Sequence, residues 1–113
     1  MDFALNMHPQ TKNTNKFKAK IFNALADPIR LEILECLRNG ERCVCEIIPH
    51  LGIAQPLVSR HLAILKNCGL VTHRKKGNRR FYSVTDPEVF HIIDAITADL
   101  VDALSKRVIE QIV

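Results

Sequence analysis

Residues 52–84 read GIAQPLVSRHLAILKNCGLVTHRKKGNRRFYSV, and this stretch decides the fold. A segment opened by proline leads into a helix over 55–68, where apolar residues recur with helical spacing and a glycine follows the end. Two strands over 71–84 come next, and the pair Gly77-Asn78 between them supplies the positive φ that a tight hairpin requires. The pattern predicts a helix-turn-helix followed by a β-hairpin.

The basic side chains are concentrated in the same part of the chain. Residues 47–85 contain seven Lys or Arg and no Asp or Glu, whereas residues 1–46 contain seven basic and six acidic residues and residues 86–113 contain two and six. The net charge of +4 therefore comes from one stretch. Because a merely soluble surface intersperses the two signs, this segregation predicts a face that binds nucleic acid.

Length and composition indicate one globular domain. A chain of 113 residues with 47% hydrophobic and 25% charged residues can bury a single core, and the aromatic share of 5% favours a core of aliphatic side chains on helices. The longest uncharged stretch is too short and too polar to cross a bilayer, and the N-terminus lacks the apolar centre of a signal peptide. We therefore expect a cytoplasmic protein without a membrane partner.

The segments before the quoted stretch complete the domain, which we place at 16–113 after a mobile N-terminal arm at 1–15. Apolar periodicity predicts helices over 16–26, 28–38 and 44–51. The second should be the buried centre of the domain, with Asp27 as its N-cap and Pro28 at its first position. Pro49 lies inside the third, so that helix is either kinked or very short.

A single long helix is predicted over 87–112. It would be about 37 Å long, which is more than one small domain can cover, and its apolar residues form a stripe at spacings of three and four. We expect the uncovered part of this stripe to pair with a second subunit, with the first helix alongside. The resulting molecule would be a homodimer.

Three segments resemble one family of regulators. FNALADPIRLEIL at 22–34, QPLVSRHLAIL at 55–65 and GNRRFYSV at 77–84 resemble the ArsR/SmtB family of winged-helix repressors. The resemblance covers about 21–84. It implies a mainly α fold with a small β-hairpin wing that dimerises through its first and last helices. It also implies a repressor, and not an enzyme, that binds inverted repeats in double-stranded DNA and releases them when an inducer binds.

The recognition helix and the wing supply the predicted DNA contacts. The amide of Gln55 suits adenine, the guanidinium of Arg60 suits guanine, and Ser59 can reach a base or a phosphate. Pro56, which the resemblance also places at a base, can make only apolar contact, and His61 is expected to be a packing residue. A two-fold dimer would place its recognition helices about 34 Å apart. Contacts from the wing are expected to fix the position of the protein on DNA more than to read its sequence. The remaining predicted contacts are Lys66, Lys75, Lys76, Asn78 and Arg79.

A Cys-x-Cys pair precedes the recognition helix. Four cysteines in a cytosolic chain predict reduced thiols, not a disulfide framework. In arsenic- and cadmium-responsive members of the family, the positions matching Cys43 and Cys45 supply thiolate ligands, which suit soft ions. On a regular helix, side chains two residues apart diverge by about 200°. Chelation by both thiols therefore predicts an unwound helix start, and that distortion is a candidate trigger for release of DNA.

The pair has no obvious third ligand. Arsenic-responsive relatives often carry a cysteine three residues after the second, where this chain has Ile48. Cys36, Cys68 and His8 are candidate substitutes, although both cysteines are more typical of packed thiols. The expected inducer is As(III), Sb(III), Cd or another soft metal, and no cofactor is expected for DNA binding itself. Two thiols without a third ligand are also typical of a redox or reactive-sulfur switch, and a purely structural role stays open.

Other functions fit the sequence less well. A dithiol oxidoreductase using the same cysteines would leave the basic stretch without a role. A sequence-independent DNA-binding protein would bind every duplex equally, whereas a repressor prefers its operator by about 10³-fold or more. Zinc- and nickel-type relatives bind metal between paired last helices, but the matching positions here hold only carboxylates, which are a poor zinc site: Asp86, Glu88, Asp99 and Asp102.

Overall fold

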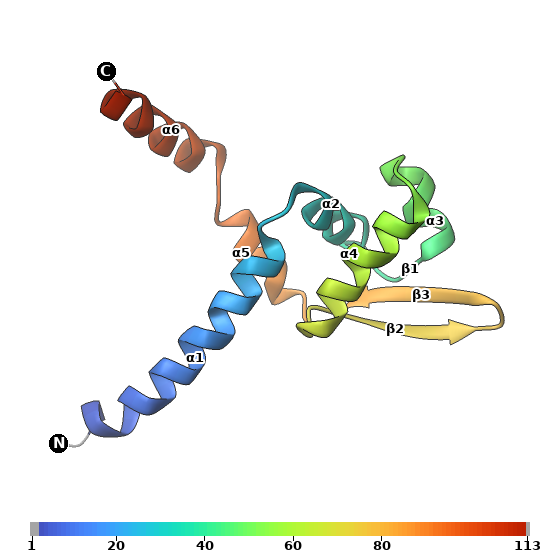
Figure 1. The fold of residues 1–113 in the computed structure, drawn as a ribbon, viewed down its shortest axis with the longest axis horizontal. Helices are drawn as coiled ribbons and strands as arrows, with labels where there is room; N and C mark the ends of the chain where they lie inside the picture. Colours follow the sequence, from blue (N-terminus) through green and yellow to red (C-terminus); the bar gives the residue numbers. More distant parts are fainter. Residues whose placement is uncertain (1–2, 113) are drawn as a thin grey trace.

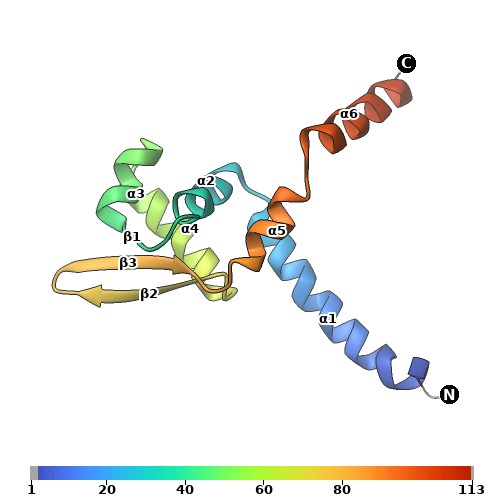
Figure 2. The ribbon, with the colours of Figure 1, turned by 180° about the vertical axis from the view of Figure 1, so that it is seen from behind.

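The chain forms a helical body with a three-stranded sheet and two projecting helices. The computed structural model describes residues 3–112, and it describes side-chain surroundings from residue 14 to residue 112. Helices α1 and α6 project from one end of the body, and the hairpin of β2 and β3 extends from the other (Figures 1 and 2). The elements are, in order, α1 (Phe3–Leu25), α2 (Pro28–Cys36), β1 (Arg42–Cys43), α3 (Val44–Leu51), α4 (Gln55–Asn67), β2 (Val71–Lys76), β3 (Arg79–Val84), α5 (Glu88–Asp94) and α6 (Ala98–Ile112).

Helix α2 lies at the centre of the body, as predicted. Ile33 and Leu34 are fully buried, and they belong to one apolar cluster that also contains the inner side chains of α3, α4 and β2. The start of α2 is fixed by Asp27, whose Oδ1 accepts the backbone N–H groups of Ile29 at 2.8 Å and Arg30 at 3.3 Å. A carboxylate at this position satisfies N–H groups that have no partner inside the helix.

Helices α3 and α4 form the predicted helix-turn-helix. Gly52 ends α3 in the left-handed conformation, with φ of 66°, and its N–H donates to the carbonyl of Ile48 at 3.0 Å. Helix α4 then begins at Gln55 with Pro56 in its first turn, where a missing N–H costs nothing. Pro49 lies in the last turn of the short helix α3, so the helix extends only two residues beyond it.

The sheet contains one strand more than the predicted hairpin. Strands β2 and β3 pair antiparallel, and Lys76 faces Arg79 across a two-residue turn in which only Gly77 has positive φ. Strand β1 pairs with the other edge of β3, so that β3 is central. A two-residue strand carries no periodic pattern, which is why the sequence did not predict it.

Two predicted boundaries are wrong. The last helix is not continuous over 87–112, because residues 95–97 separate α5 from α6. Thr97 explains the break, since its hydroxyl accepts the backbone N–H of Leu100 at 3.2 Å and begins a new helix. At the other end of the chain, α1 begins at Phe3, so most of the segment predicted as an arm is helical.

Helix α5 is attached to the end of α2 by one arginine. The Arg38 guanidinium donates to both carboxylate oxygens of Asp94 at 2.8 Å and to both of Glu35 at 2.6 and 3.0 Å. It also lies over the ring of Phe90 at 4.5 Å. These hydrogen bonds hold the pKa of Asp94 below its ordinary value. The contacts fix where the chain leaves the body towards α6.

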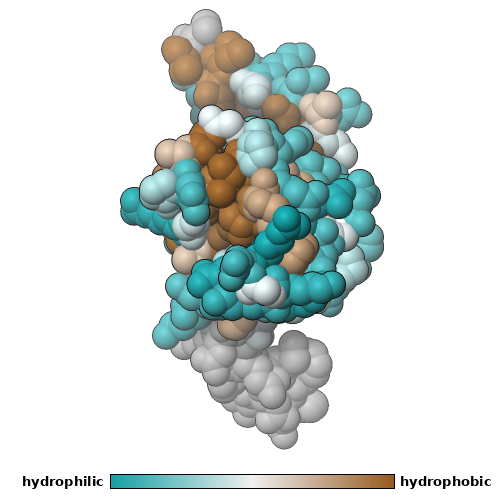
Figure 3. Space-filling view, turned by 90° about the vertical axis from the view of Figure 1, so that its right-hand side faces the viewer, coloured by the Kyte–Doolittle hydropathy of each residue, from teal (hydrophilic) through white to brown (hydrophobic). Residues whose placement is uncertain are grey.

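The two projecting helices expose apolar side chains. No residue of α6 is buried, and Leu104, Val108 and Ile112 are 57%, 54% and 79% exposed. On α1, Phe17 and Phe22 are 59% and 60% exposed. Apolar residues are visible where α6 projects at the top of Figure 3. None of the described helices is long and apolar enough to cross a bilayer.

Candidate functional site

Helix α4 presents two different faces. Val58, Leu62 and Leu65 point into the core and are at most 1% exposed. The remaining surface of the helix carries every residue that the sequence predicts to contact DNA there, and all five are exposed: Gln55, Pro56, Ser59, Arg60 and Lys66. The inner leucines and valine thus hold the helix while its polar side chains face solvent, which is the arrangement needed to read a DNA groove.

His61 is the one buried polar residue among those described, at 8% exposure, which agrees with its expected packing role. Its Nδ1 lies 3.2 Å from a terminal nitrogen of Arg30. The same guanidinium donates to the carbonyl of Ala24 at 2.6 Å and to that of Asn23 at 3.2 Å. Arg30 therefore connects the end of α1 to the recognition helix. No sequence pattern predicts this contact, because the two residues are 31 positions apart.

The predicted contacts in the wing are also exposed. Lys75, Lys76, Asn78 and Arg79 surround the hairpin turn. Arg74, by contrast, donates to both carboxylate oxygens of Glu41 at 2.6 and 2.7 Å, and this contact lowers the pKa of that carboxyl. The charge of Arg74 is thus partly neutralised by an acid from the loop before β1.

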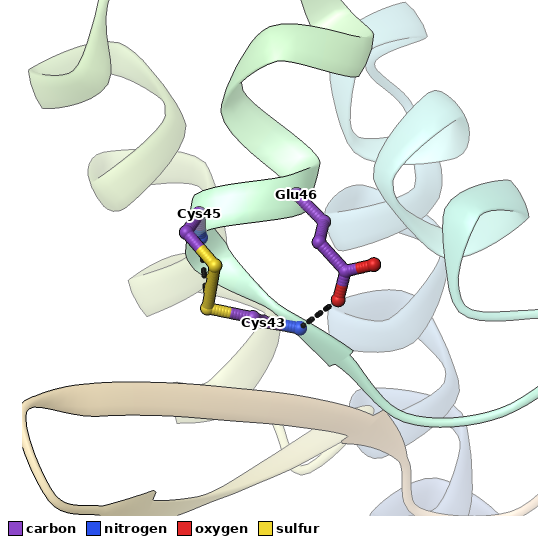
Figure 4. Close-up of a disulfide and its surroundings, with 3 residues drawn as sticks. All are labelled: Cys43, Cys45 and Glu46. Atoms are coloured by element: carbon purple, nitrogen blue, oxygen red, sulfur yellow. Dashed lines mark hydrogen bonds between the residues drawn. A yellow bond between two sulfur atoms is a disulfide. The ribbon is translucent and has the colours of Figure 1, made fainter.

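Cys43 and Cys45 meet at the start of α3, and their sulfur atoms form a disulfide (Figure 4). The sequence predicts reduced thiols, whereas the structure joins this pair. The two Cα atoms are 5.1 Å apart, because Cys43 has extended backbone, with φ of −70° and ψ of 144°, and is the N-cap of α3. Only Cys45 lies within the helix. The sulfurs therefore approach each other without the unwinding that a regular helix would require.

The cysteines also take part in capping α3. The Sγ of Cys43 accepts the backbone N–H of Cys45 at 3.1 Å, and the carboxylate of Glu46 accepts the N–H of Cys43 at 3.1 Å (Figure 4). This reciprocal pattern is a capping box with sulfur in the place of a hydroxyl. Cys43 is 3% exposed, whereas Cys45 is exposed.

A hollow of about 550 Å³ lies between α3, α4 and β3, and the disulfide forms part of its wall. Figure 3 faces the tip of the wing and shows hydrophilic side chains around an apolar patch. Five of the predicted DNA contacts also line the hollow: Gln55, Ser59, Lys66, Asn78 and Arg79. A chemical change at the cysteines would therefore occur beside the residues predicted to read DNA.

Neither of the two candidate cysteines, Cys36 and Cys68, joins the pair in a metal-binding group. Cys36 lines a separate hollow with Arg42 and His50, and burial raises the pKa of its thiol. Cys68 ends α4, where its thiol donates to the carbonyl of Leu65 at 3.2 Å. The side chain of His8 is outside the described residues. Within the described part of the chain, no three Cys, His, Asp or Glu side chains are grouped to hold a metal ion.

Zinc- and nickel-type relatives bind metal between their last helices. The carboxylates at the matching positions of this chain have local partners or belong to different elements. Asp86 accepts the backbone N–H of Glu88 at 2.9 Å, just before α5. Glu88 lies 2.7 Å from the Nδ1 of His91. Asp99 and Asp102 are on α6, beyond the break in the last helix. These residues do not form a donor cluster in the described chain.

An exposed second helix of a helix-turn-helix, followed by a basic hairpin, defines the winged helix-turn-helix class of DNA-binding domain. Residues 27–73 match the model of the family described as "Bacterial regulatory protein, arsR family". An uncharacterized HTH-type transcriptional regulator from Methanocaldococcus jannaschii is 48% identical over 69% of this chain and 89% of its own length. The chain therefore belongs to the arsR family of bacterial regulatory proteins, which are transcription regulators and not enzymes.

Two further relatives are informative. A protein from Streptomyces lividans named "Probable mercury resistance operon repressor" is 44% identical over 76% of this chain, which spans 64% of that relative. The solution structure of the homodimeric winged helix-turn-helix DNA-binding domain Mb0332 from Mycobacterium bovis superposes with a TM-score of 0.68 and 29% identity. That match covers 90% of each chain. The fold class predicted from the sequence is thereby confirmed.

Proposed function

We propose that this protein is a homodimeric transcriptional repressor that binds an inverted-repeat operator and releases it when a thiophilic metal or metalloid binds Cys43 and Cys45. One observation carries the proposal: the two sulfurs lie in the same hollow as five of the predicted DNA contacts. Sulfur is a soft donor and suits such ions. Because a DNA regulator works where the chromosome is, we place the protein in the cytoplasm.

The donor set fits a soft ion only in part. Reduction of the disulfide would free two thiolates on one turn of backbone, with Cα atoms 5.1 Å apart. A third protein ligand is absent among the described side chains. The ion would supply a bond to each sulfur, while the chain holds both donors at the start of α3. The name of the Streptomyces lividans relative favours mercury, and the family resemblance favours arsenic.

Anisotropy of labelled DNA tests this function. Fully reduced protein should bind DNA from upstream of its own gene tightly, and roughly stoichiometric As(III) or Hg(II) should abolish the binding. Cys43→Ser should bind equally well and keep its DNA, because serine can cap α3 but is a hard donor. Cys68→Ser is the matched control and should respond like the unmodified protein. Release of DNA from Cys43→Ser at the same ion concentration would refute the proposed site.

A second candidate signal is oxidation of the same pair, and the disulfide itself is the observation that favours it. Oxidation removes two protons and two electrons from the dithiol and forms one S–S bond. Diamide should then release the operator from the reduced protein, and dithiothreitol should restore binding. Operator binding that stays tight in diamide, under conditions where mass spectrometry shows the disulfide, would exclude this signal.

Arg60 is predicted to read a base. Replacing it by Ala should weaken operator binding by about 1–3 kcal/mol, because a bidentate contact to guanine is lost. The affinity for an unrelated duplex should fall much less. Competition titrations with both duplexes at one salt concentration would measure the two losses. Equal losses on both duplexes would show that Arg60 contacts only the backbone.

Lys76 and Arg74 allow a matched comparison in the wing. Lys76→Ala should make the slope of log K against log salt concentration shallower by about one unit, because one phosphate contact is lost. Arg74→Ala should change the slope less, since Glu41 already balances that charge. Binding isotherms at four salt concentrations would give both slopes. A slope unchanged in Lys76→Ala would place the wing away from the phosphates.

A further inference from the structure

The hollow beside the disulfide is strongly cationic. Lys66, Arg79 and Arg80 line it, and its lining contains no Asp or Glu. All three are exposed, and none of the ion pairs found among residues 14–112 involves them. Burial, together with Lys66 and Arg80, lowers the pKa of nearby His73, as expected in a positive field. A surface with this lining attracts small anions as well as DNA.

The two sulfurs of the disulfide differ in access. Both cysteines line the hollow, but Cys43 is 3% exposed while Cys45 is an exposed residue, so an incoming nucleophile has freer access to Cys45. The sulfur of Cys43 accepts a backbone N–H at 3.1 Å and stands at the N-terminus of α3. Both features stabilise a thiolate. Since exchange is faster when the departing sulfur is a stable thiolate, Cys43 is suited to be the leaving group.

We propose that the hollow binds anionic low-molecular-weight thiols, which undergo thiol–disulfide exchange at Cys45. The inference rests on the second candidate signal above, the redox state of the pair. It names the class of molecule that changes this state. The cations hold the anionic group of the ligand, and Cys45, an exposed residue, lines the same hollow.

The exchange takes place in two steps that conserve atoms and electrons. First, the ligand thiolate bonds to the sulfur of Cys45, the S–S bond breaks, and Cys43 leaves as a thiolate. Second, another ligand thiolate attacks the ligand sulfur of the mixed disulfide and releases Cys45 as a thiolate. Two ligand thiols are thereby oxidised to one ligand disulfide, and the protein pair is reduced by two electrons.

Three thiols of similar size and different charge test the site: 2-mercaptoethanesulfonate, 2-mercaptoethanol and cysteamine. Oxidised protein would be mixed with each in the absence of DNA, quenched with acid and analysed by mass spectrometry. Rates would be corrected for the thiolate fraction and the basicity of each thiol. The sulfonate should react about 10-fold or more faster than the cationic thiol, with the adduct on Cys45, and 0.5 M salt should remove most of this advantage.

Charge-reversal variants complete the test. Arg79→Glu should lose most of the preference for the sulfonate, whereas Lys106→Glu on α6, which changes the net charge equally, should retain it. The proposal would be overturned by equal corrected rates for the three thiols or by equal effects of the two variants. A first adduct on Cys43 would overturn it as well. Because the assay contains no DNA, its failure is independent of the repressor function. Operator binding that ignores the redox state would refute the second candidate signal alone.

Discussion

Replacing Leu104 by Asp should convert the proposed dimer into a monomer and weaken operator binding by about 10²–10⁴-fold, the range expected when two linked binding events become one. Leu104 is 57% exposed on α6, and neither it nor any other residue of that helix is buried in a single chain. A carboxylate placed in an interface formed by this apolar stripe would lose its water without gaining a partner. Analytical ultracentrifugation would give the oligomeric state, and anisotropy would give the affinity.

A duplex with one half-site and a control variant make the result specific. Leu104→Asp should bind a single half-site as well as the unmodified protein does, because α4 and the wing are unchanged. Lys106→Asp places an acid on the polar side of α6, one turn from Asp102 and from Glu110, and should remain dimeric. A dimeric Leu104→Asp protein would show that the subunits pair through a different surface.

Leu62→Ala should destabilise the folded protein by about 2–5 kcal/mol, the usual cost of removing a buried leucine side chain. Leu62 is 1% exposed on the inner face of α4 and packs with the other side chains that hold the recognition helix on the body. This loss of stability combines two contributions: the burial of apolar side-chain atoms that is lost, and the cavity that remains in the core. Urea denaturation followed by circular dichroism would measure the midpoint and slope of unfolding.

Leu57→Ala is the matched control for this experiment. Leu57 lies in the same helix and undergoes the same chemical change, but it is already 38% exposed. It should cost much less stability. Both variants must be compared at one protein concentration, since dimerisation contributes to the apparent free energy of unfolding. Similar losses in the two variants would mean that burial on α4 does not decide the stability of the domain.

The parts of the fold that the sequence predicted correctly are those with strong local signals. Asp27 followed by Pro28 defined the start of α2, and Gly77 in a basic hairpin defined the turn between β2 and β3. The break at 95–97 was missed because the apolar stripe continues in register across it. Thr97 was the available signal, as a hydroxyl-bearing residue able to cap a new helix.

The site was predicted in part, because the chemistry of single residues is local whereas their juxtaposition is not. The sequence identified Cys43 and Cys45 as a pair, but helical spacing predicted that their side chains diverge unless the helix start is unwound. Their contact depends on the extended conformation of Cys43, which no spacing rule specifies. The contact between Arg30 and His61 depends on how α2 packs against α4, and sequence spacing does not predict it either. The same holds for the hollow, whose walls come from β1, α3, α4, β3 and the hairpin turn.

Strand β1 has an evolutionary consequence. It joins the sheet through backbone pairing of Arg42 with Tyr82 and of Cys43 with Phe81, which requires no particular side chain at position 43. That position is also buried and caps α3, and a small hydroxyl residue such as Ser or Thr can meet both requirements. Mutation can therefore replace the sulfur, and with it the signal that is detected, without loss of the DNA-binding architecture. A lineage with this fold can change what it senses by a few substitutions at one helix start.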